Sequence, residues 1–155
     1  LVKNGVLTGR LHSAATAAAL DEAVTGNARA ISFEFEPIVR MTSTWIAGGT
    51  DTFESLLRGA EGGLYIPDFF HGSGMSTFTI APARAYRIRG GKLAEPVLVS
   101  VISGNVMQTL HQIDGATAET ELRSLFTGGC GKMEQWPLRV AFGGPYLRVR
   151  GLKVQ

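Results

Sequence analysis

The stretch ARAYRIRGG, residues 83–91, decides the fold class of this chain. Its first seven residues are strand-like, and the Gly90-Gly91 pair is a hairpin signal, because glycine accepts the positive φ angles of a two-residue turn. We expect this strand to pair through the turn with a strand at residues 97–102. The chain as a whole, with 20 glycines and with Val, Ile, Thr and Phe spread along it, favours strands and turns over long helices. Further strands are predicted at residues 6–11, 32–36, 40–46, 64–70, 76–80, 138–142 and 146–154.

Three short segments have helical patterns instead. Thr52 is placed to cap a helix at residues 52–60, and Ser13 is placed to cap an Ala-rich helix at residues 12–20. A third apolar stripe at helical spacing falls in residues 105–113. The sequence therefore predicts a β-rich α+β fold, with a mostly antiparallel sheet or barrel-like sheet packing and two or three short helices.

Length and composition indicate one globular domain at residues 1–155. A hydrophobic fraction of 45% and a charged fraction of 18% are those of a chain that can bury a core. The net charge is +2 and the 15 basic residues are dispersed, which argues against direct nucleic-acid binding. No apolar run approaches the roughly 20 residues that span a bilayer, so we expect no membrane contact. The chain opens on Leu1 in the middle of a pattern, which we interpret as the carboxyl-terminal fragment of a longer protein.

The single cysteine, Cys130, lies in FTGGCGKMEQWP, residues 126–137, between glycines. One cysteine forms no internal disulfide, which favours a reducing compartment, the cytoplasm. Glycine neighbours let a metal approach the thiolate closely, and Lys132 is placed to favour the charged thiolate. The alternative is a small apolar residue in a turn. The histidines His12, His71 and His111 are scattered, and no two have metal-ligand spacing.

Several short motifs, taken in chain order, resemble one known family. Cys130-Gly131-Lys132 followed by Gln135 is similar to the C-G-K-x-G-Q loop of the TldD/PmbA family of metallopeptidases, and residues 37–44, PIVRMTST, are similar to its P-x-x-R-M-T-N-T segment. The chain departs from these motifs at Met133-Glu134 and at Ser43. The other matching pieces are Gly5-Val6-Leu7, Leu11-His12-Ser13, Thr16-Ala17, Thr25-Gly26-Asn27-Ala28-Arg29, Gly63-Leu64-Tyr65, Pro96-Val97, Gly104-Asn105 and Leu147 to Leu152.

The resemblance implies a carboxyl-terminal domain that contributes to a zinc site. In the TldD branch, zinc is held by two histidines of an H-E-x-x-x-H motif and by a cysteine of the carboxyl-terminal domain, to which Cys130 corresponds. The PmbA or TldE branch lacks the metal ligands. This chain has no H-E-x-x-x-H. We therefore expect zinc only in the complete protein, and no hydrolysis by this chain alone.

The resemblance also suggests where a peptide substrate lies. In a strand at residues 40–46, the side chains of Arg40, Thr42 and Thr44 share one face. We expect this face to line the substrate cleft, where an extended peptide adds as a strand. The alternative is a polar face exposed to solvent.

Two functions follow from these expectations. In the first, the chain belongs to a TldD-like zinc metallopeptidase that acts on peptides or small unfolded proteins and works with a PmbA/TldE-like subunit or with a second copy of itself. In the second, it is a non-catalytic partner or scaffold module without metal, a regulator of the kind that the family's old label, modulator of DNA gyrase, suggests.

Overall fold

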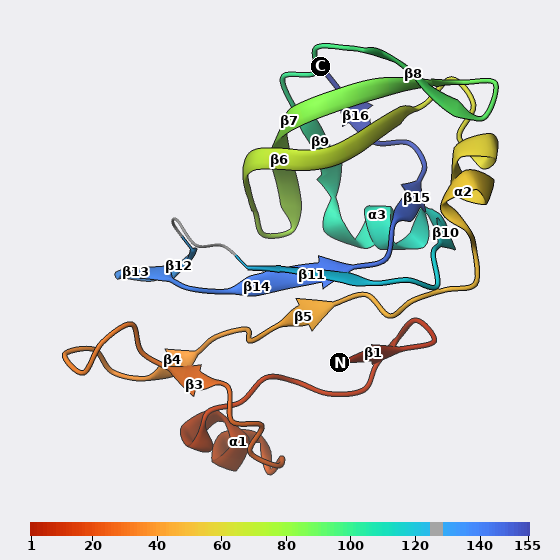
Figure 1. Ribbon diagram of the computed structural model, residues 1–155. Helices are drawn as coiled ribbons and strands as arrows, with labels where there is room; N and C mark the ends of the chain where they lie inside the picture. Colours follow the sequence, from red (N-terminus) through yellow and green to blue (C-terminus); the bar gives the residue numbers. More distant parts are fainter. Residues whose placement is uncertain (125–128) are drawn as a thin grey trace. The chain divides into compact units, whose positions relative to one another are not determined.

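Strand β7 (Thr77–Arg89) is the centre of a five-stranded sheet in the computed structural model, which describes residues 1–124 and 129–155 (Figure 1). Strand β6 (Leu64–Gly74) runs antiparallel along one edge of β7, as the olive and green arrows show (Figure 1). The other edge is shared: β9 (Ile102–Asn105) pairs with the first part of β7, and β8 (Lys92–Pro96) pairs with its end. This sheet is open, not a barrel.

The Gly90-Gly91 hairpin signal is confirmed. Arg89 pairs with Lys92 across a two-residue turn in which Gly90 and Gly91 have φ angles of 56° and 67°. Such paired positive angles define the turn that matches the twist of two strands. The Glu61 carboxylate accepts from the N–H groups of Gly91 and Gly90 at 3.0 Å each, and these bonds lower the pKa of Glu61.

The strand that follows this turn differs from the expected one. It is β8, directly after the glycines, whereas only Ile102 of the predicted residues 97–102 is in a strand, the first residue of β9. The strands predicted at residues 76–80 and 83–89 are one strand, β7, which continues through Pro82. Pro82 lies opposite Phe69, where the register between β6 and β7 shifts. On the other edge of β7, it lies between the residues that pair with β9 and those that pair with β8. A proline costs little at such a place because no ladder bond needs its missing N–H.

Helix α2 (Phe53–Gly59) begins at the predicted cap, where the Thr52 side chain accepts from the Ser55 N–H at 3.1 Å. Leu56 and Leu57 on its inner face are buried. Its first residue, Phe53, contacts Tyr65 of β6 and Tyr146, with ring centroids 5.3 and 4.8 Å apart. The helix is therefore fastened by apolar burial and by one edge-to-face and one tilted aromatic pair.

The other two predicted helices are also confirmed. Helix α1 (Ala14–Leu20) starts after Ser13, whose side chain accepts from the Thr16 N–H, and α3 (Val106–His111) starts after Asn105. None of the helices formed by residues 1–124 and 129–155 is long and apolar enough to cross a membrane. The strand predicted at residues 32–36 is wrong. Those residues form a turn because the Ser32 carbonyl and hydroxyl accept from the N–H groups of Phe35 and Glu34.

The chain divides into two compact units, each described by itself. Unit 1 is Leu1–Ile46 with Leu122–Gly143, and unit 2 is Ala47–Glu121 with Gly144–Gln155. The organisation of residues 1–155 as a single domain stays a prediction. Unit 2 contains a core cluster of Ala85, Val99 and Ile102, against which Leu64, Ile66, Val97 and Leu152 pack.

The remaining strands are short and mostly antiparallel, which confirms the β-rich α+β class. In unit 2, β10 (Ile113–Ala116) pairs with β15 (Leu147–Val149), and β16 (Lys153–Val154) pairs with β9. In unit 1, β1 pairs with β2, β3 with β4 and β12 with β13, while β14 lies between β11 and β5. Their bounds are β1 Val2–Lys3, β2 Val6–Leu7, β3 Ala28–Arg29, β4 Ile38–Val39, β5 Thr44–Trp45, β11 Glu121–Ser124, β12 Cys130–Lys132, β13 Gln135–Leu138 and β14 Ala141–Gly144.

Candidate functional site: the cysteine hairpin

Cys130 is the first residue of an antiparallel hairpin, β12–β13, in unit 1. It pairs with Leu138, and Lys132 pairs with Gln135 around a two-residue turn that begins at Met133 with φ 54°. Gly129, directly before the cysteine, has φ 154°, and a Cβ there would lie 2.2 Å from the Leu138 carbonyl oxygen. Only glycine fits this approach. The thiol is free and half-buried, and among the residues that the structure describes its one hydrogen-bond contact is a weak one of 3.8 Å to the Gly131 carbonyl.

Arg40 holds this hairpin by its backbone. The guanidinium, only 2% exposed, donates from Nη2 to the Cys130 carbonyl oxygen at 2.8 Å and from Nη1 to the Gln135 carbonyl oxygen at 3.5 Å. One planar side chain thus binds both strands of the hairpin. A hydrogen bond to a charged donor is about twice as strong as a neutral one, and a buried guanidinium needs such acceptors.

Two further buried polar side chains complete the contact. Asn27 (5% exposed) accepts from the Arg40 N–H through its backbone carbonyl at 2.9 Å, and its side-chain amide donates to the Arg40 carbonyl at 3.3 Å. Gln135 (5% exposed) donates to the Glu36 carbonyl at 2.8 Å and accepts from the Ile31 N–H at 3.2 Å. We call Asn27, Arg40 and Gln135 the buried polar triad. It joins the β3–β4 segment, where Asn27 and Arg40 lie 13 positions apart, to the hairpin residue Gln135, 95 positions beyond Arg40.

Lys132 adds another anchor to the same hairpin. Its ammonium donates to the Val39 carbonyl oxygen at 2.7 Å, on strand β4. The sequence interpretation gave Lys132 an electrostatic effect on the Cys130 thiolate. The structure gives the ammonium a backbone acceptor, and this bond ties β12 to the segment that carries Arg40.

Arg40, Thr42 and Thr44 do not lie on one continuous strand. Residues 40–43 are outside the strands, and only Thr44 belongs to β5, where it pairs in parallel with Phe142 of β14. Arg40 is buried whereas Thr42 and Thr44 are exposed. The predicted strand at residues 40–46 is therefore wrong, because the buried Arg40 is committed to the hairpin. A role of these residues in substrate binding stays a prediction.

The described residues do not form a complete metal site. Within residues 1–124 and 129–155, no three His, Cys, Asp or Glu side chains gather closely enough to hold a metal ion. Cys130 offers one thiolate, a normal zinc ligand, where a catalytic zinc needs three protein ligands. The residues present fit a zinc site only as the source of one ligand, with the others supplied from outside these residues.

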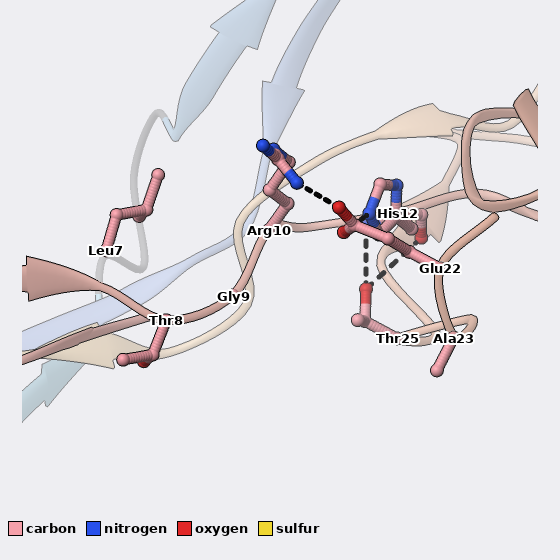
Figure 2. Close-up of a pocket in the computed structure, with 8 residues that line it drawn as sticks. All are labelled: Leu7, Thr8, Gly9, Arg10, His12, Glu22, Ala23 and Thr25. Carbon is pink, nitrogen blue, oxygen red and sulfur yellow. Dashed lines mark hydrogen bonds and ion pairs between the residues drawn. The ribbon is translucent and has the colours of Figure 1, made fainter. Parts of the chain in front are cut away.

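A second polar cluster in unit 1 was missed by the sequence analysis. His12, 2% exposed, contacts Thr16 Oγ1 through Nδ1 at 3.1 Å and Glu22 Oε2 through Nε2 at 2.7 Å, and Arg10 also pairs with Glu22 (Figure 2). Thr25 Oγ1 accepts from the His12 backbone N–H at 2.7 Å. The bond from His12 and, less strongly, the Arg10 guanidinium lower the pKa of Glu22.

This cluster lines a pocket of about 410 Å³ with the segment before α1 (Figure 2). Its paired side chains link the start of α1 to the residue beyond its end, so the cluster holds the helix in place. The only sequence signal was that His12 lies at the start of the helix predicted at residues 12–20 and Glu22 lies two residues beyond its end, a weak indication of a contact.

Known proteins similar to this chain belong to the class of metalloproteases. Curated relatives of the chain are metalloproteases by name, and its fold is found in solved structures. The chain belongs to the PmbA/TldA metallopeptidase C-terminal domain family, whose model matches residues 1–155. The resemblance read from the hairpin and from the other motifs is thereby confirmed.

Two relatives show how much of a protein this chain represents. It is 44% identical over 155 residues to a metalloprotease of Synechocystis, which covers 99% of this chain and 33% of the relative. It is 31% identical over 156 residues to a protein of Saccharolobus solfataricus named zinc metalloprotease TldD homolog, at 99% and 34% coverage. The chain thus spans about a third of the length of the curated relatives that it matches.

Two solved structures share the fold. TldE from Thermococcus kodakarensis matches with a TM-score of 0.77 at 18% identity, over 99% of this chain and 33% of that one. A putative modulator of a DNA gyrase from Thermotoga maritima matches with a TM-score of 0.69 at 22% identity, over 99% and 32%. At these identities the likeness concerns the fold alone.

Proposed function

We propose that residues 1–155 are the carboxyl-terminal domain of a TldD-like zinc metallopeptidase that acts in the cytoplasm on peptides or small unfolded proteins. Cys130 supplies one zinc ligand, and the other ligands come from the rest of the protein. Thr42 and Thr44, both exposed, belong to the substrate cleft, and Arg40 acts there through the hairpin that it holds. The complete protein works with a PmbA/TldE-like subunit or with a second copy of itself.

The observation that carries this proposal is the way in which the thiol is mounted. A metal ligand must be held in one position so that little conformational entropy is lost on binding, and the groups behind it provide that rigidity. Arg40, Gln135 and Lys132 fasten both strands of the hairpin to the rest of unit 1, while Sγ itself makes only the weak contact to Gly131 within the described part of the chain. The backbone of Cys130 is thus held in place, while its thiol stays available to bind a metal.

Zinc, when bound, supplies Lewis-acid polarisation of the peptide carbonyl. The residues of this chain have other tasks. Cys130 would hold the zinc through its thiolate as one of three protein ligands. The buried polar triad fixes the backbone that carries that thiolate, and the exposed hydroxyls of Thr42 and Thr44 offer hydrogen bonds to an extended peptide.

The test compares the intact protein with its Cys130→Ser variant. Metal content after dialysis and the absorption of the cobalt-substituted protein report the ligand directly, because thiolate–cobalt charge transfer is absent without the sulfur. We expect the variant to lose this absorption, most of its zinc and its peptide hydrolysis. Met133→Asn is the matched control in the same hairpin, since asparagine tolerates the φ of 54° and carries no thiol. It should keep all three properties.

The second candidate is a non-catalytic partner or scaffold module without metal. One observation favours it. On the hairpin at residues 130–138, the side chains that commonly bind zinc are Cys130 and the exposed Glu134, so the hairpin alone does not build a metal site. If Cys130→Ser binds zinc and cobalt as the unmodified protein does, or if neither protein binds metal, the zinc proposal is wrong and this candidate takes its place.

A further inference from the structure

Unit 1 has a second pocket, of about 380 Å³, with an unusual lining. It presents two guanidinium groups and three hydroxyl groups, and no carboxylate among the described residues that line it. The lining residues are Arg29, Thr42, Ser43, Ser124, Arg139, Val140 and Ala141. A pocket lined by two permanently charged guanidinium groups and three hydroxyl groups has the chemistry of an anion site.

Arg29 is only partly satisfied by the protein. One of its Nη groups donates to the Met41 carbonyl oxygen, which holds the side chain in place. Its Nε atom is buried and has no hydrogen-bond partner within the described part of the chain. A buried N–H without an acceptor is unfavourable, and the described residues thus use only part of the hydrogen-bonding capacity of Arg29.

Arg139 provides the second charge and lies next to the cysteine hairpin in sequence. It directly follows Leu138, the residue that pairs with Cys130 across β12 and β13. Arg139 is exposed, and none of the residues at 1–124 and 129–155 forms an ion pair or hydrogen bond with its side chain. Its guanidinium is therefore available to a ligand.

We propose that this pocket binds a carboxylate of the peptide substrate, an inference that rests on the proposed peptidase function. Arg29 and Arg139 donate to the carboxylate oxygens, and the hydroxyls of Thr42, Ser43 and Ser124 donate beside them. A planar guanidinium matches a carboxylate in shape as well as in charge, which makes arginine the suited residue. The carboxylate is either the carboxyl terminus of the peptide or an Asp or Glu side chain.

Binding of three acetylated pentapeptides to the intact protein tests this, with the metal removed by a chelator so that hydrolysis plays no part. The first is pentaalanine with a free carboxyl terminus, the second is its amide, and the third is the amide with a central Glu. We expect a carboxylate to tighten the dissociation constant by roughly 10- to 100-fold over the neutral amide. A gain for the first peptide alone identifies the chain terminus as the ligand, and a gain for the third identifies a side chain.

Arg139→Gln is the decisive variant, because an exposed side chain without protein partners can be changed without disturbing the fold. It should bind all three peptides equally. Lys3→Gln removes one exposed positive charge that lines neither pocket, and it should keep the preference for a carboxylate. Added salt should weaken the carboxylate gain and leave the amide unaffected.

The proposal is overturned if the free acid and the amide bind equally, if Arg139→Gln retains the preference, or if none of the peptides binds. The peptide-binding results and the zinc-binding results test the two proposals independently. Cys130→Ser decides whether the thiol is a metal ligand, and its preference for carboxylate peptides should be that of the unmodified protein. Loss of metal ligation with an intact carboxylate preference would refute only the zinc proposal.

Discussion

The Arg40 guanidinium donates to the backbone carbonyl of Cys130 across 2.8 Å, although the two residues are separated by 90 positions in the chain. This contact joins the segment after β4 to the hairpin that carries the single thiol. It is made to a main-chain atom, so it fixes the place of residue 130 whatever the side chain does. The environment of the candidate zinc ligand is therefore set by a residue that never touches the sulfur.

Arg40→Ala should loosen the hairpin in the intact protein. The substitution removes the donor from two carbonyls, and a buried acceptor left without a partner costs about 1–3 kcal/mol. We expect faster amide hydrogen exchange in β12 and β13, and a zinc dissociation constant that rises together with it. Arg40→Lys, which restores one donor and the charge, should recover part of both effects. Unchanged exchange in residues 130–138 of Arg40→Ala would show that the hairpin does not depend on this side chain.

Gly129→Ala should separate the two strands of the hairpin. The new Cβ would meet the Leu138 carbonyl oxygen at 2.2 Å, and a φ of 154° is strained for any residue with a side chain. The backbone strain alone costs about 1–3 kcal/mol. The matched control is Gly9→Ala, because a Cβ at Gly9 meets nothing within 4 Å. Thermal unfolding of both variants checks this, and equal stability of the two would contradict the described geometry.

Acid should weaken the attachment of α1, and Glu22→Gln should remove that sensitivity. The pKa of Glu22 is lowered from its ordinary value of 4.5, first by the hydrogen bond from His12 and then by Arg10. A pKa that is lower in the folded state contributes stability above the unfolded value, and this stability is lost as the pH falls through the folded value. The difference in amide exchange of α1 between the unmodified protein and Glu22→Gln should therefore shrink between about pH 6 and about pH 3.

Glu134→Gln serves as the control for this pH dependence. Glu134 is exposed on the turn of the hairpin, and no described residue pairs with it. Its exchange difference from the unmodified protein should be small at both pH values. A difference for Glu22→Gln that stays constant with pH would mean that the charge of Glu22 does not hold the helix.

Leu56→Ala should destabilise unit 2 far more than Leu98→Ala does. Leu56 is 5% exposed on the inner face of α2, whereas Leu98 is 95% exposed. Truncation of a buried leucine costs about 2–5 kcal/mol, and an exposed one lies within about 0.5 kcal/mol of neutral. Denaturant unfolding of the two variants measures the contrast. Similar midpoints would show that the burial of Leu56 does not stabilise unit 2.

Local sequence signals were sufficient where the structure depends on neighbouring residues. Ser13 and Thr52 cap the helices that they were expected to cap, and Gly90-Gly91 makes the expected turn. The strand predicted at residues 40–46 was wrong because a period of two does not reveal a side chain that is drawn inward by a distant carbonyl. The buried triad could not be derived for the same reason, since Asn27, Arg40 and Gln135 meet only through the tertiary fold.

The same limit applies to the candidate site. The thiol was found because it is the single cysteine among glycines, and the family resemblance gave it a role. The two arginines of the carboxylate pocket, Arg29 and Arg139, lie 110 positions apart by their numbers and belong to no common motif. Spacing along the chain says nothing about such a pair. Part of the stretch at residues 126–137 that contains Cys130, residues 126–128, lies outside the described residues.

Arg40 of the buried polar triad binds the hairpin through main-chain carbonyls, and this has an evolutionary consequence. Arg40 recognises the carbonyls of Cys130 and Gln135, and every amino acid at those positions offers the same carbonyl. The hydrogen bond from Arg40 to residue 130 thus does not depend on the side chain at that position. A gene copy that exchanges this cysteine for another small residue keeps the fold and loses only the sulfur. Under the zinc role proposed for Cys130, metal-binding and metal-free versions of one architecture are then a single codon apart, and a duplicated gene can diverge into both without rebuilding either.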